Sequence, residues 1–410
     1  QEMEDTIMIK RIGMLTSGGD CQALNATMRG VVKGLTNSID DLEVYGFDDG
    51  YKGLIYGKYR MLTSKDFSGI LTQGGTILGT SRQPFKLMRV PDENGLDKVE
   101  AMKSTYRKLG LDCLVILGGN GTQKTANLLR EGGLNIIHLP KTIDNDLPCT
   151  DHTPGFGSAA KYVAITTQEI VRDSTVYSLP SVTIIEIMGR HAGWLAASSC
   201  VLRVNGESAP HLIYVPECTF SVKRFLQDVK KEMAKHKAVV VAISEGVSLD
   251  GDAESAYQSG ETDCFGHKYL SGVGKALEQI VRNEIGCKVR SIELNVMQRC
   301  SSHICSKTDI TEAEQIGAAG VRCALKGETG TVMVFRRVRN MPYTIAIESA
   351  SASKIANQER YLPASFLNAQ QNNITDEALQ YFLPLIQGEV QIQMENGLPK
   401  HFTVQEAILK

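Results

Sequence analysis

Residues 140–146 read Pro-Lys-Thr-Ile-Asp-Asn-Asp, and they follow an apolar run, residues 134–139, that has the composition of a buried strand. Pro140 cannot donate to a β-ladder, so the charged side chains of this heptad fall where the strand ends. In open α/β sheets, ligands bind in the crevice at the carboxyl ends of the strands. An ammonium, a hydroxyl and two carboxylates at such an edge point to phosphoryl transfer, although a solvated turn that caps the next element uses the same residue types.

Apolar runs alternate with amphipathic segments along most of the chain. Strand composition is found at residues 9–15, 113–117, 134–139, 182–187, 212–215, 239–243 and 331–335. Helical composition or period is found at residues 23–35, 123–130 and 222–235. Most of the strand runs are continuously apolar, as expected for strands that helices cover on both faces. The alternation predicts an α/β fold with mostly parallel sheets. It weakens beyond residue 339 into a mixed tail, residues 343–410, in which residues 378–385 are a candidate helix.

Length and composition limit the possible classes of protein. A chain of 410 residues is too long for one compact core, so we expect two domains. The formal net charge of -2 gives no electrostatic reason to expect nucleic acid or an anionic membrane as a partner. The chain contains no run of the roughly 20 apolar residues that a membrane span needs, and its first 20 residues hold a strand and a glycine turn instead of a secretory signal. We therefore expect a cytoplasmic protein.

The ten cysteines are scattered, and many lie in apolar or small-residue runs. This placement is typical of reduced thiols in a protein core. Cys300, His303 and Cys305 are close enough to raise the question of a metal site, but no second cysteine pair stands at zinc-finger spacing. We interpret them as packing residues.

Two strand runs end in glycine turns that lead toward helices. The first turn contains Gly18 and Gly19, and the second, residues 118–122, reads Gly-Gly-Asn-Gly-Thr. A phosphate can approach the backbone amides of such turns closely and gain from the partial positive charge of a helix start. A tight corner without a ligand needs the same glycines, but two such turns in one sheet favour a polyphosphate donor. Neither a Walker A loop nor a dinucleotide fingerprint is present.

Further charged residues follow other strand runs or glycine-rich turns. Arg82 follows a glycine-containing turn, Arg190 follows the run 182–187, and Glu245 follows the run 239–243. Guanidinium groups suit phosphate oxygens, and a carboxylate can bind sugar hydroxyls. Each of these residues alone would be interpreted as a surface charge. Their repeated occurrence at such positions favours one shared anion-binding site.

Five short motifs resemble the 6-phosphofructokinase family in their order and spacing: residues 16–20, 79–82, 140–146, 186–190 and 298–299. The resemblance spans about residues 9–340. It implies two doubly wound, Rossmann-like α/β domains with the active site in the cleft between them. It also implies Mg²⁺-dependent transfer of a phosphoryl group to the 1-hydroxyl of fructose 6-phosphate, a step of glycolysis. The family's assembly implies a homodimer or homotetramer with sites completed across the subunit interface.

The resemblance also implies how the chain is divided. Residues 1–157 and about 298–345 would form the domain that binds the phosphoryl donor. Residues 158–297 and about 346–410 would form the sugar-phosphate domain with a C-terminal extension.

Carried onto this chain, the resemblance implies that Asp144 is the general base that takes the proton of the attacking sugar hydroxyl. An ordinary, ionised aspartate can do this, because positioning counts for more than basicity in a loose phosphoryl-transfer transition state. Thr142 would hold the sugar or the transferring phosphoryl group, and Arg190 would stabilise charge in the transition state. Lys141 would lie beside the donor phosphates.

The resemblance implies three further groups of residues. The donor would be bound by Gly19, Arg82, Gly119, Asn120, Gly121 and Thr122. Besides Thr142, Asp144 and Arg190, the sugar phosphate would be bound by Met188, Gly189, Glu245, Arg290 and Arg299, with Arg290 reaching the site of the neighbouring subunit. Mg²⁺ would be held by Asn120 and Asp146.

The chain departs from the family pattern at three positions. Asn120 stands where the family has an aspartate that helps to hold Mg²⁺, so the metal site should be weaker or shifted. Ser181 and Val296 stand where many bacterial members have an arginine and a histidine. Other cations must therefore bind the 6-phosphate.

Two positions that usually separate ATP-dependent from pyrophosphate-dependent members disagree in this chain. Gly121 matches the small residue that leaves room for the α-phosphate and nucleoside of ATP, where pyrophosphate users carry an aspartate. Lys141 matches the lysine typical of pyrophosphate users. Exclusion by a side chain is the harder constraint, so we predict ATP as the donor and keep pyrophosphate as the alternative.

Two other classes of protein compete with this interpretation. Asn120 fits a sugar-phosphate-binding regulator that has lost its chemistry, although the residues expected to act on the substrates remain. A kinase for another acceptor, such as a lipid or a nicotinamide dinucleotide, would share the glycine turn but would not need the 140–146 heptad.

Overall fold

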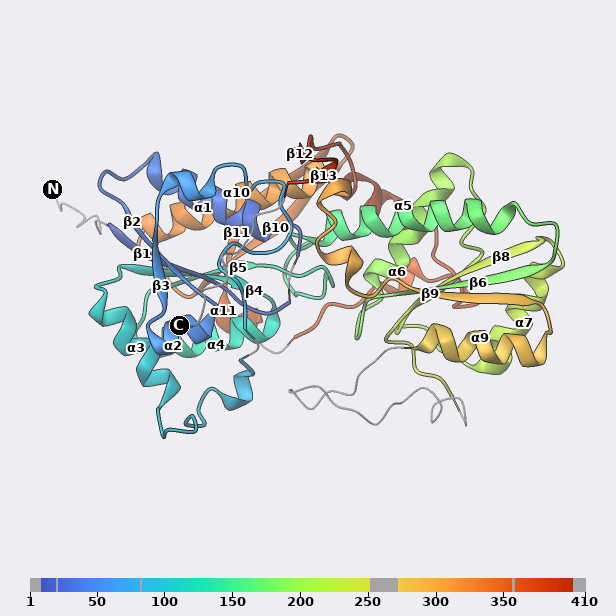
Figure 1. The fold of residues 1–410 in the computed structure, drawn as a ribbon, viewed down its shortest axis with the longest axis horizontal. Helices are drawn as coiled ribbons and strands as arrows, with labels where there is room; N and C mark the ends of the chain where they lie inside the picture. The colour runs from blue at the N-terminus through green and yellow to red at the C-terminus, as the bar shows by residue number, and fades with distance from the viewer. Residues whose placement is uncertain (1–8, 20, 82, 251–271, 356–357, 401–410) are drawn as a thin grey trace.

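The computed structural model describes residues 9–19, 21–81, 83–250, 272–355 and 358–400. In it the chain forms two lobes that lie side by side along the long axis, each with a sheet between layers of helices (Figure 1). The mixed α/β class with parallel sheets is confirmed.

The first lobe contains a seven-stranded sheet in the order β11-β10-β5-β4-β1-β2-β3. Its strands are β1 (Arg11–Thr16), β2 (Glu43–Phe47), β3 (Tyr59–Leu62), β4 (Cys113–Gly118), β5 (Ile136–Pro140), β10 (Thr331–Asn340) and β11 (Tyr343–Ser351). The strands from β10 to β2 are parallel, and the edge strands β3 and β11 are antiparallel to their neighbours. The carboxyl ends of the parallel strands therefore meet at one edge of the sheet.

Helices cover both faces of this sheet (Figure 1). One face carries α1 (Leu24–Thr36) and α10 (Lys307–Leu325), and the other carries α2 (Tyr51–Tyr56), α3 (Lys98–Lys108), α4 (Asn120–Glu131) and α11 (Ala352–Ile355). Strand β4 shows why its sequence has no alternation. Val115 and Leu117 belong to one buried apolar cluster, whereas Leu114 and Ile116 belong to a second cluster on the opposite face. Both faces of the strand need apolar side chains.

The second lobe contains a four-stranded, fully parallel sheet in the order β7-β8-β6-β9. Its strands are β6 (Ser181–Ile187), β7 (Leu212–Tyr214), β8 (Ala238–Ser244) and β9 (Lys288–Glu293). Helices α5 (Phe156–Thr175) and α6 (Trp194–Ser198) lie on one face, and α7 (Val222–Met233) and α9 (Val273–Glu284) lie on the other (Figure 1).

The C-terminal segment is more ordered than its sequence predicts. Strand β11 pairs with β10, so residues 346–351 lie in the first sheet and not, as we predicted, with the sugar-phosphate domain. The rest of the predicted division into domains stays a prediction. The segment continues through α12 (Glu377–Leu385), which confirms the predicted helix, to the short strands β12 (Met394–Glu395) and β13 (Leu398–Pro399). Helix α12 contacts both α5 and β10 and thus joins the two lobes.

Two properties of the described residues bear on the sequence predictions. None of their helices is long and apolar enough to cross a bilayer. Of the nine cysteines within the described ranges, five are buried, three are partly buried and Cys149 is exposed, so the prediction of core thiols holds for most of them. Cys264 lies outside those ranges.

Candidate active site

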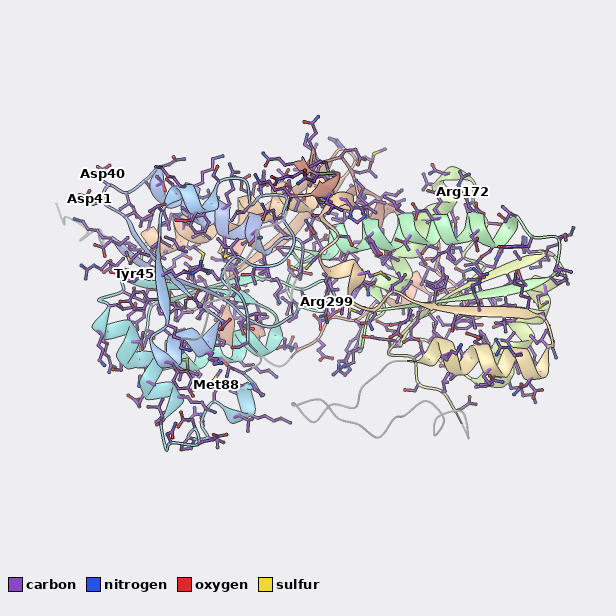
Figure 2. All side chains as sticks on the ribbon, in the orientation of Figure 1. Asp40, Asp41, Tyr45, Met88, Arg172 and Arg299 are labelled. Carbon is purple, nitrogen blue, oxygen red and sulfur yellow. The ribbon has the colours of Figure 1, made fainter. Side chains whose placement is uncertain are left out.

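A cleft of about 560 Å³ opens where the carboxyl ends of β1, β4 and β5 meet the loop that follows β6. Figure 2 shows Arg299 where the two lobes meet. Residues from both lobes line the cleft. Those that the sequence predicted are Gly19, Gly119, Asn120, Gly121, Thr122, Lys141, Thr142, Asp144, Asp146, Met188, Arg190 and Arg299.

The 140–146 heptad is held at the cleft by its own backbone. Lys141 N–H donates to the Gly118 carbonyl at 3.0 Å, which continues the β4–β5 pairing for one residue. Asp144 N–H then donates to Thr142 Oγ1 at 3.1 Å. Asn145 has a φ of 58°, in the left-handed region that asparagine tolerates better than most residues. This turn brings Asp144 and Asp146, on either side of the buried Asn145, to the same cleft.

Two cations adjoin the first glycine turn. Lys141 Nζ donates to the Gly19 carbonyl, and it lies only 3.3 Å from the place where a Cβ at Gly18 would stand. A Cβ at Gly19 would lie 3.9 Å from the Arg299 guanidinium. The absence of side chains at these glycines leaves room for an anion between the backbone and the two cations. Helix α1 begins at Leu24, close to the start that we predicted, so a few residues separate it from the turn.

The second glycine turn leads directly into a helix, as predicted. Helix α4 begins at Asn120, so the backbone amides of its first turn open into the cleft. Asn120 Oδ1 is buried and has no hydrogen-bond partner among the residues that the structure describes. Gly121 lines the cleft, and a Cβ added to it would meet no atom within 4 Å. The cleft is thus open beside Gly121, the residue that we used to discriminate between ATP and pyrophosphate as donors.

The two carboxylates of the heptad titrate abnormally. Burial raises the pKa of Asp144, and the charges of Arg299, Lys141 and Arg190 offset only part of this effect. Burial raises the pKa of Asp146 to about 7, with a further contribution from the Asp144 carboxylate. The pKa of Asp144 is thus raised, whereas we expected an ordinary aspartate at this position. Perturbed carboxylates beside cations in a cleft are typical of functional sites.

In the second lobe, Met188 and Arg190 line the cleft, whereas Gly189 and Glu245 support them from outside the lining. Gly189 has a φ of 142°, and a Cβ there would lie 2.7 Å from the Ala192 carbonyl oxygen, so only glycine fits. Its N–H donates to Glu245 Oε1 at 3.3 Å. Burial raises the pKa of Glu245 to about 7 despite this hydrogen bond, and the Asp144 charge adds to the shift. Glu245 is thus electrostatically coupled to the cleft without lining it.

The remaining predicted residues lie elsewhere. Arg290 on β9 forms an ion pair with Asp173 at 2.9 Å and lines a separate small recess together with Ser181 and Lys288. Its predicted contact with a neighbouring subunit's site stays a prediction. Arg82 lies outside the described residues.

Sequence reasoning missed several residues that line the cleft: Ser17, Ser81, Gln83, Pro84, Phe85, Lys86, Lys124 and Ile143. Lys124 could have been found, because it follows Asn120 by about one turn of α4 and therefore shares its face. Phe85 and Lys86 belong to a 3-10 helix, Phe85–Leu87, inside a long connection without a periodic pattern. The 79–82 motif predicted that this connection reaches the donor, but no local pattern extended the prediction to Phe85 and Lys86.

The arrangement can bind a polyphosphate and activate a hydroxyl. Backbone amides at a helix start and the cations of Lys141 and Arg299 offer sites for phosphate oxygens. Arg190 comes from the opposite lobe, and Asp144 supplies a carboxylate that can accept a proton. Charge neutralisation around a carboxylate base is the equipment that phosphoryl transfer requires.

Comparisons with known proteins agree with this chemistry. The family model described as "Phosphofructokinase" matches residues 11–324. A pyrophosphate--fructose 6-phosphate 1-phosphotransferase of Halomonas elongata is 32% identical over 394 residues, which cover 94% of this chain and 93% of the relative. An ATP-dependent 6-phosphofructokinase of Spirochaeta thermophila is 38% identical over 336 residues, which cover 80% of this chain and 87% of the relative.

Among solved structures, a pyrophosphate-dependent phosphofructokinase from Marinobacter aquaeolei superposes with a TM-score of 0.82 at 29% identity. The match covers 96% of this chain and 95% of the other. The two-lobed fold, the residues gathered at the cleft and these matches lead to one conclusion. This chain belongs to the phosphofructokinase family, whose members are phosphotransferases.

Proposed function

We propose that this chain transfers a phosphoryl group to the 1-hydroxyl of fructose 6-phosphate and so forms fructose 1,6-bisphosphate. The observation that carries the proposal is the position of Asp144 in a cleft that also holds Lys141, Arg190 and Arg299. The carboxylate would accept the proton of the sugar hydroxyl, while the cations surround the phosphates. The names of the curated relatives support fructose 6-phosphate as the acceptor.

In this mechanism each residue has a limited task. The three cations lower the pKa of Asp144 against the effect of burial, which favours the ionised form that can accept a proton. Thr142 Oγ1 accepts a hydrogen bond from Asp144 N–H and thereby fixes the start of the turn. Arg190 would stabilise the charge that spreads over the transferring phosphoryl oxygens. Lys141 and the glycine amides would hold the donor in line with the sugar hydroxyl.

Asn120 and Asp146 are the residues that would hold Mg²⁺ in this cleft. Both offer the oxygen ligands that this cation prefers, and the buried Asn120 Oδ1 lacks a hydrogen-bond partner within the described part of the chain. The described residues contain no group of three or more His, Cys, Asp or Glu side chains placed to bind a metal, so donor phosphates would complete the coordination. When bound, Mg²⁺ would neutralise charge on those phosphates. An amide ligand in place of a carboxylate should weaken its binding.

We propose ATP as the donor because of the space at Gly121. A Cβ there would meet no atom within 4 Å, and the cleft extends past Gly121 to Lys124 and Phe85. This space can accept an α-phosphate and a nucleoside. The ATP-dependent relative from Spirochaeta thermophila shows that a donor of this kind is used by a protein of similar sequence.

Pyrophosphate is the second candidate donor. Lys141 favours it, because its ammonium lies against the first glycine turn, where it can bind a terminal phosphate. The Halomonas elongata and Marinobacter aquaeolei proteins, which match nearly the full length of this chain, carry pyrophosphate in their names. These matches support pyrophosphate at least as well as the space at Gly121 supports ATP.

A coupled assay that compares ATP, GTP and pyrophosphate at fixed fructose 6-phosphate and Mg²⁺ tests the proposal. We expect turnover with ATP. Turnover with pyrophosphate alone would overturn the donor assignment and leave the reaction intact. A lack of turnover with every donor, together with measurable binding of fructose 6-phosphate, would favour the non-catalytic regulator instead.

A further inference from the structure

We propose that Arg360 and Tyr381 are positioning residues that hold the 140–151 loop in the conformation that brings Asp144 into the cleft. Both residues belong to the C-terminal segment, beyond the region that the family model matches. Neither Arg360 nor Tyr381 is among the described residues that line the cleft. The inference rests on the proposed function, because it concerns the same base.

Arg360 binds the main chain of the loop at three residues. Its own backbone N–H donates to the Asp146 carbonyl at 2.8 Å. Its guanidinium donates to the Asn145 carbonyl through Nη2 at 2.9 Å and through Nε at 3.2 Å, and Nη1 donates to the Asp151 carbonyl. Hydrogen bonds from a charged donor are the stronger kind. One side chain thus fixes a carbonyl at the centre of the turn that carries the two carboxylates and a second carbonyl at the end of the loop.

Tyr381, on α12, binds the same 140–151 loop through hydrogen bonds of its hydroxyl group. Its hydroxyl accepts a hydrogen bond from Asn145 Nδ2 at 2.8 Å and donates to the Asp151 carbonyl at 2.5 Å. Asn145 Oδ1 in turn accepts from Thr153 N–H at 3.0 Å. Asn145 is fully buried at 0% exposure and has a positive φ, so its conformation depends on these partners. It stands between Asp144 and Asp146, and any rotation of its backbone would turn both carboxylates.

Arg360 also connects the loop to the opposite lobe. Its carbonyl accepts a hydrogen bond from Trp194 Nε1 at 3.1 Å, and its guanidinium lies 4.3 Å from the centre of the Trp194 ring. Trp194 begins α6, four residues after Arg190. The segment therefore links the backbone beside Asp144 to the helix beside Arg190. We infer that it sets the separation of the base from the cation that faces it across the cleft.

Arg360→Gln tests the inference, because it removes the charged fork and keeps a polar side chain. A displacement of about 1 Å at a reacting group can lower the rate on the order of 100-fold. We expect kcat to fall by about 10- to 100-fold while the KM for fructose 6-phosphate changes less than about 3-fold. Tyr381→Phe keeps the ring that packs on Trp194, at 5.2 Å between centroids, and should lower kcat by about 3- to 10-fold.

Arg203→Gln is the matched control. Arg203 also anchors the C-terminal segment, through hydrogen bonds to the Ile374 carbonyl and the Asp376 carboxylate, but these lie away from the 140–151 loop. We expect this variant to lose thermal stability as Arg360→Gln does and to keep its kcat within about 2-fold. Equal loss of kcat in both variants would show that the segment matters only for stability, and would overturn the proposal.

Hydrogen exchange gives a readout that needs no activity. In Arg360→Gln and Tyr381→Phe, peptides that cover residues 141–155 should exchange faster than in the wild type and in Arg203→Gln. Unchanged exchange in these peptides would refute the inference even if the wild type lacked the proposed activity. If the wild type is active and Arg360→Gln has the same kcat, the inference is refuted while the proposed function stands. If Arg360→Gln does not fold, Tyr381→Phe decides by the same two measurements.

Discussion

Replacing Gly121 by aspartate should strongly reduce the use of ATP without harming the fold. Gly121 is the second residue of α4, and a Cβ there meets no atom of the described residues within 4 Å, so attachment of the new side chain causes no clash with them. An acidic residue in the first turn of a helix is favourable by about 0.3–1 kcal/mol. We therefore expect the melting temperature of Gly121→Asp to equal or slightly exceed that of the wild type.

The expected loss of ATP use comes from charge repulsion. Gly121 lines the cleft beside the amides of the α4 start, where the phosphates would lie. Two unit charges about 5 Å apart repel by about 3 kcal/mol at an effective dielectric constant of about 20. Since about 1.4 kcal/mol corresponds to a factor of ten, kcat/KM for ATP should fall on the order of 100-fold. The shorter pyrophosphate has no α-phosphate or nucleoside to meet this charge.

Steady-state kinetics with ATP and with pyrophosphate measure the effect, and Gly121→Asn is the matched control. Asparagine has nearly the same shape as aspartate but no charge, so it should retain most of the ATP activity. If kcat/KM for ATP in Gly121→Asp stayed within about 3-fold of the wild-type value, ATP would not bind beside residue 121, and the reasoning would be refuted. An equal loss in Gly121→Asn would show that bulk and not charge excludes ATP.

Two further predictions concern stability and its pH dependence. Because the pKa of Asp146 is raised to about 7, the folded protein retains a proton between about pH 4 and 7 that the unfolded chain has lost, so stability falls as the pH rises through this window. Urea unfolding should show Asp146→Asn to be more stable than the wild type by about 1–2 kcal/mol at pH 8, and by less at pH 5. An Asp146→Asn variant with unchanged or lowered stability at pH 8 would contradict the raised pKa of Asp146. The buried His152 bridges Asp151 and Glu312 at 2.8 and 2.6 Å, and although burial lowers its pKa, the two carboxylates raise the pKa on balance. The stability that the charged His152 contributes is complete below about pH 6.5 and is lost as the pH rises through its folded pKa. Urea unfolding should therefore show His152→Gln to be less stable than the wild type by about 3–5 kcal/mol at pH 6 and by less at pH 9. A stability difference that grows with pH would exclude a charged His152.

The central strands and the heptad could be predicted because their signals are local. Strand β4 is apolar at every position since helices cover both of its faces, and the glycines after it mark the turn. Strand β9 gave no comparable signal, because it is an edge strand whose residues, such as Lys288, Arg290 and Glu293, are mostly polar and only partly buried. Strand β11 is also an edge strand, and its partly buried or exposed residues form no continuous apolar run.

What could not be predicted depends on contacts between distant parts of the chain. The pKa of Asp144 reflects burial, which raises it, and the charges of Arg299, Lys141 and Arg190, which lower it. Both the burial and the approach of Arg190 and Arg299 depend on how distant segments pack around the heptad. In the sequence, Arg360 is one arginine in a mixed polar tail, and only the fold brings its side chain to the carbonyls of Asn145 and Asp151. Asn120 could be identified from its motif, but the sequence did not indicate that its Oδ1 is buried without a hydrogen-bond partner among the described residues.

The most direct test of the account is the turnover of Asp144→Asn, measured beside its binding of fructose 6-phosphate by calorimetry. Asparagine preserves the shape of the side chain and removes the proton acceptor. We predict that kcat falls on the order of 10²- to 10⁴-fold while the dissociation constant for fructose 6-phosphate changes only a few-fold. A variant that turns over at nearly the wild-type rate would contradict the role of Asp144 as the base.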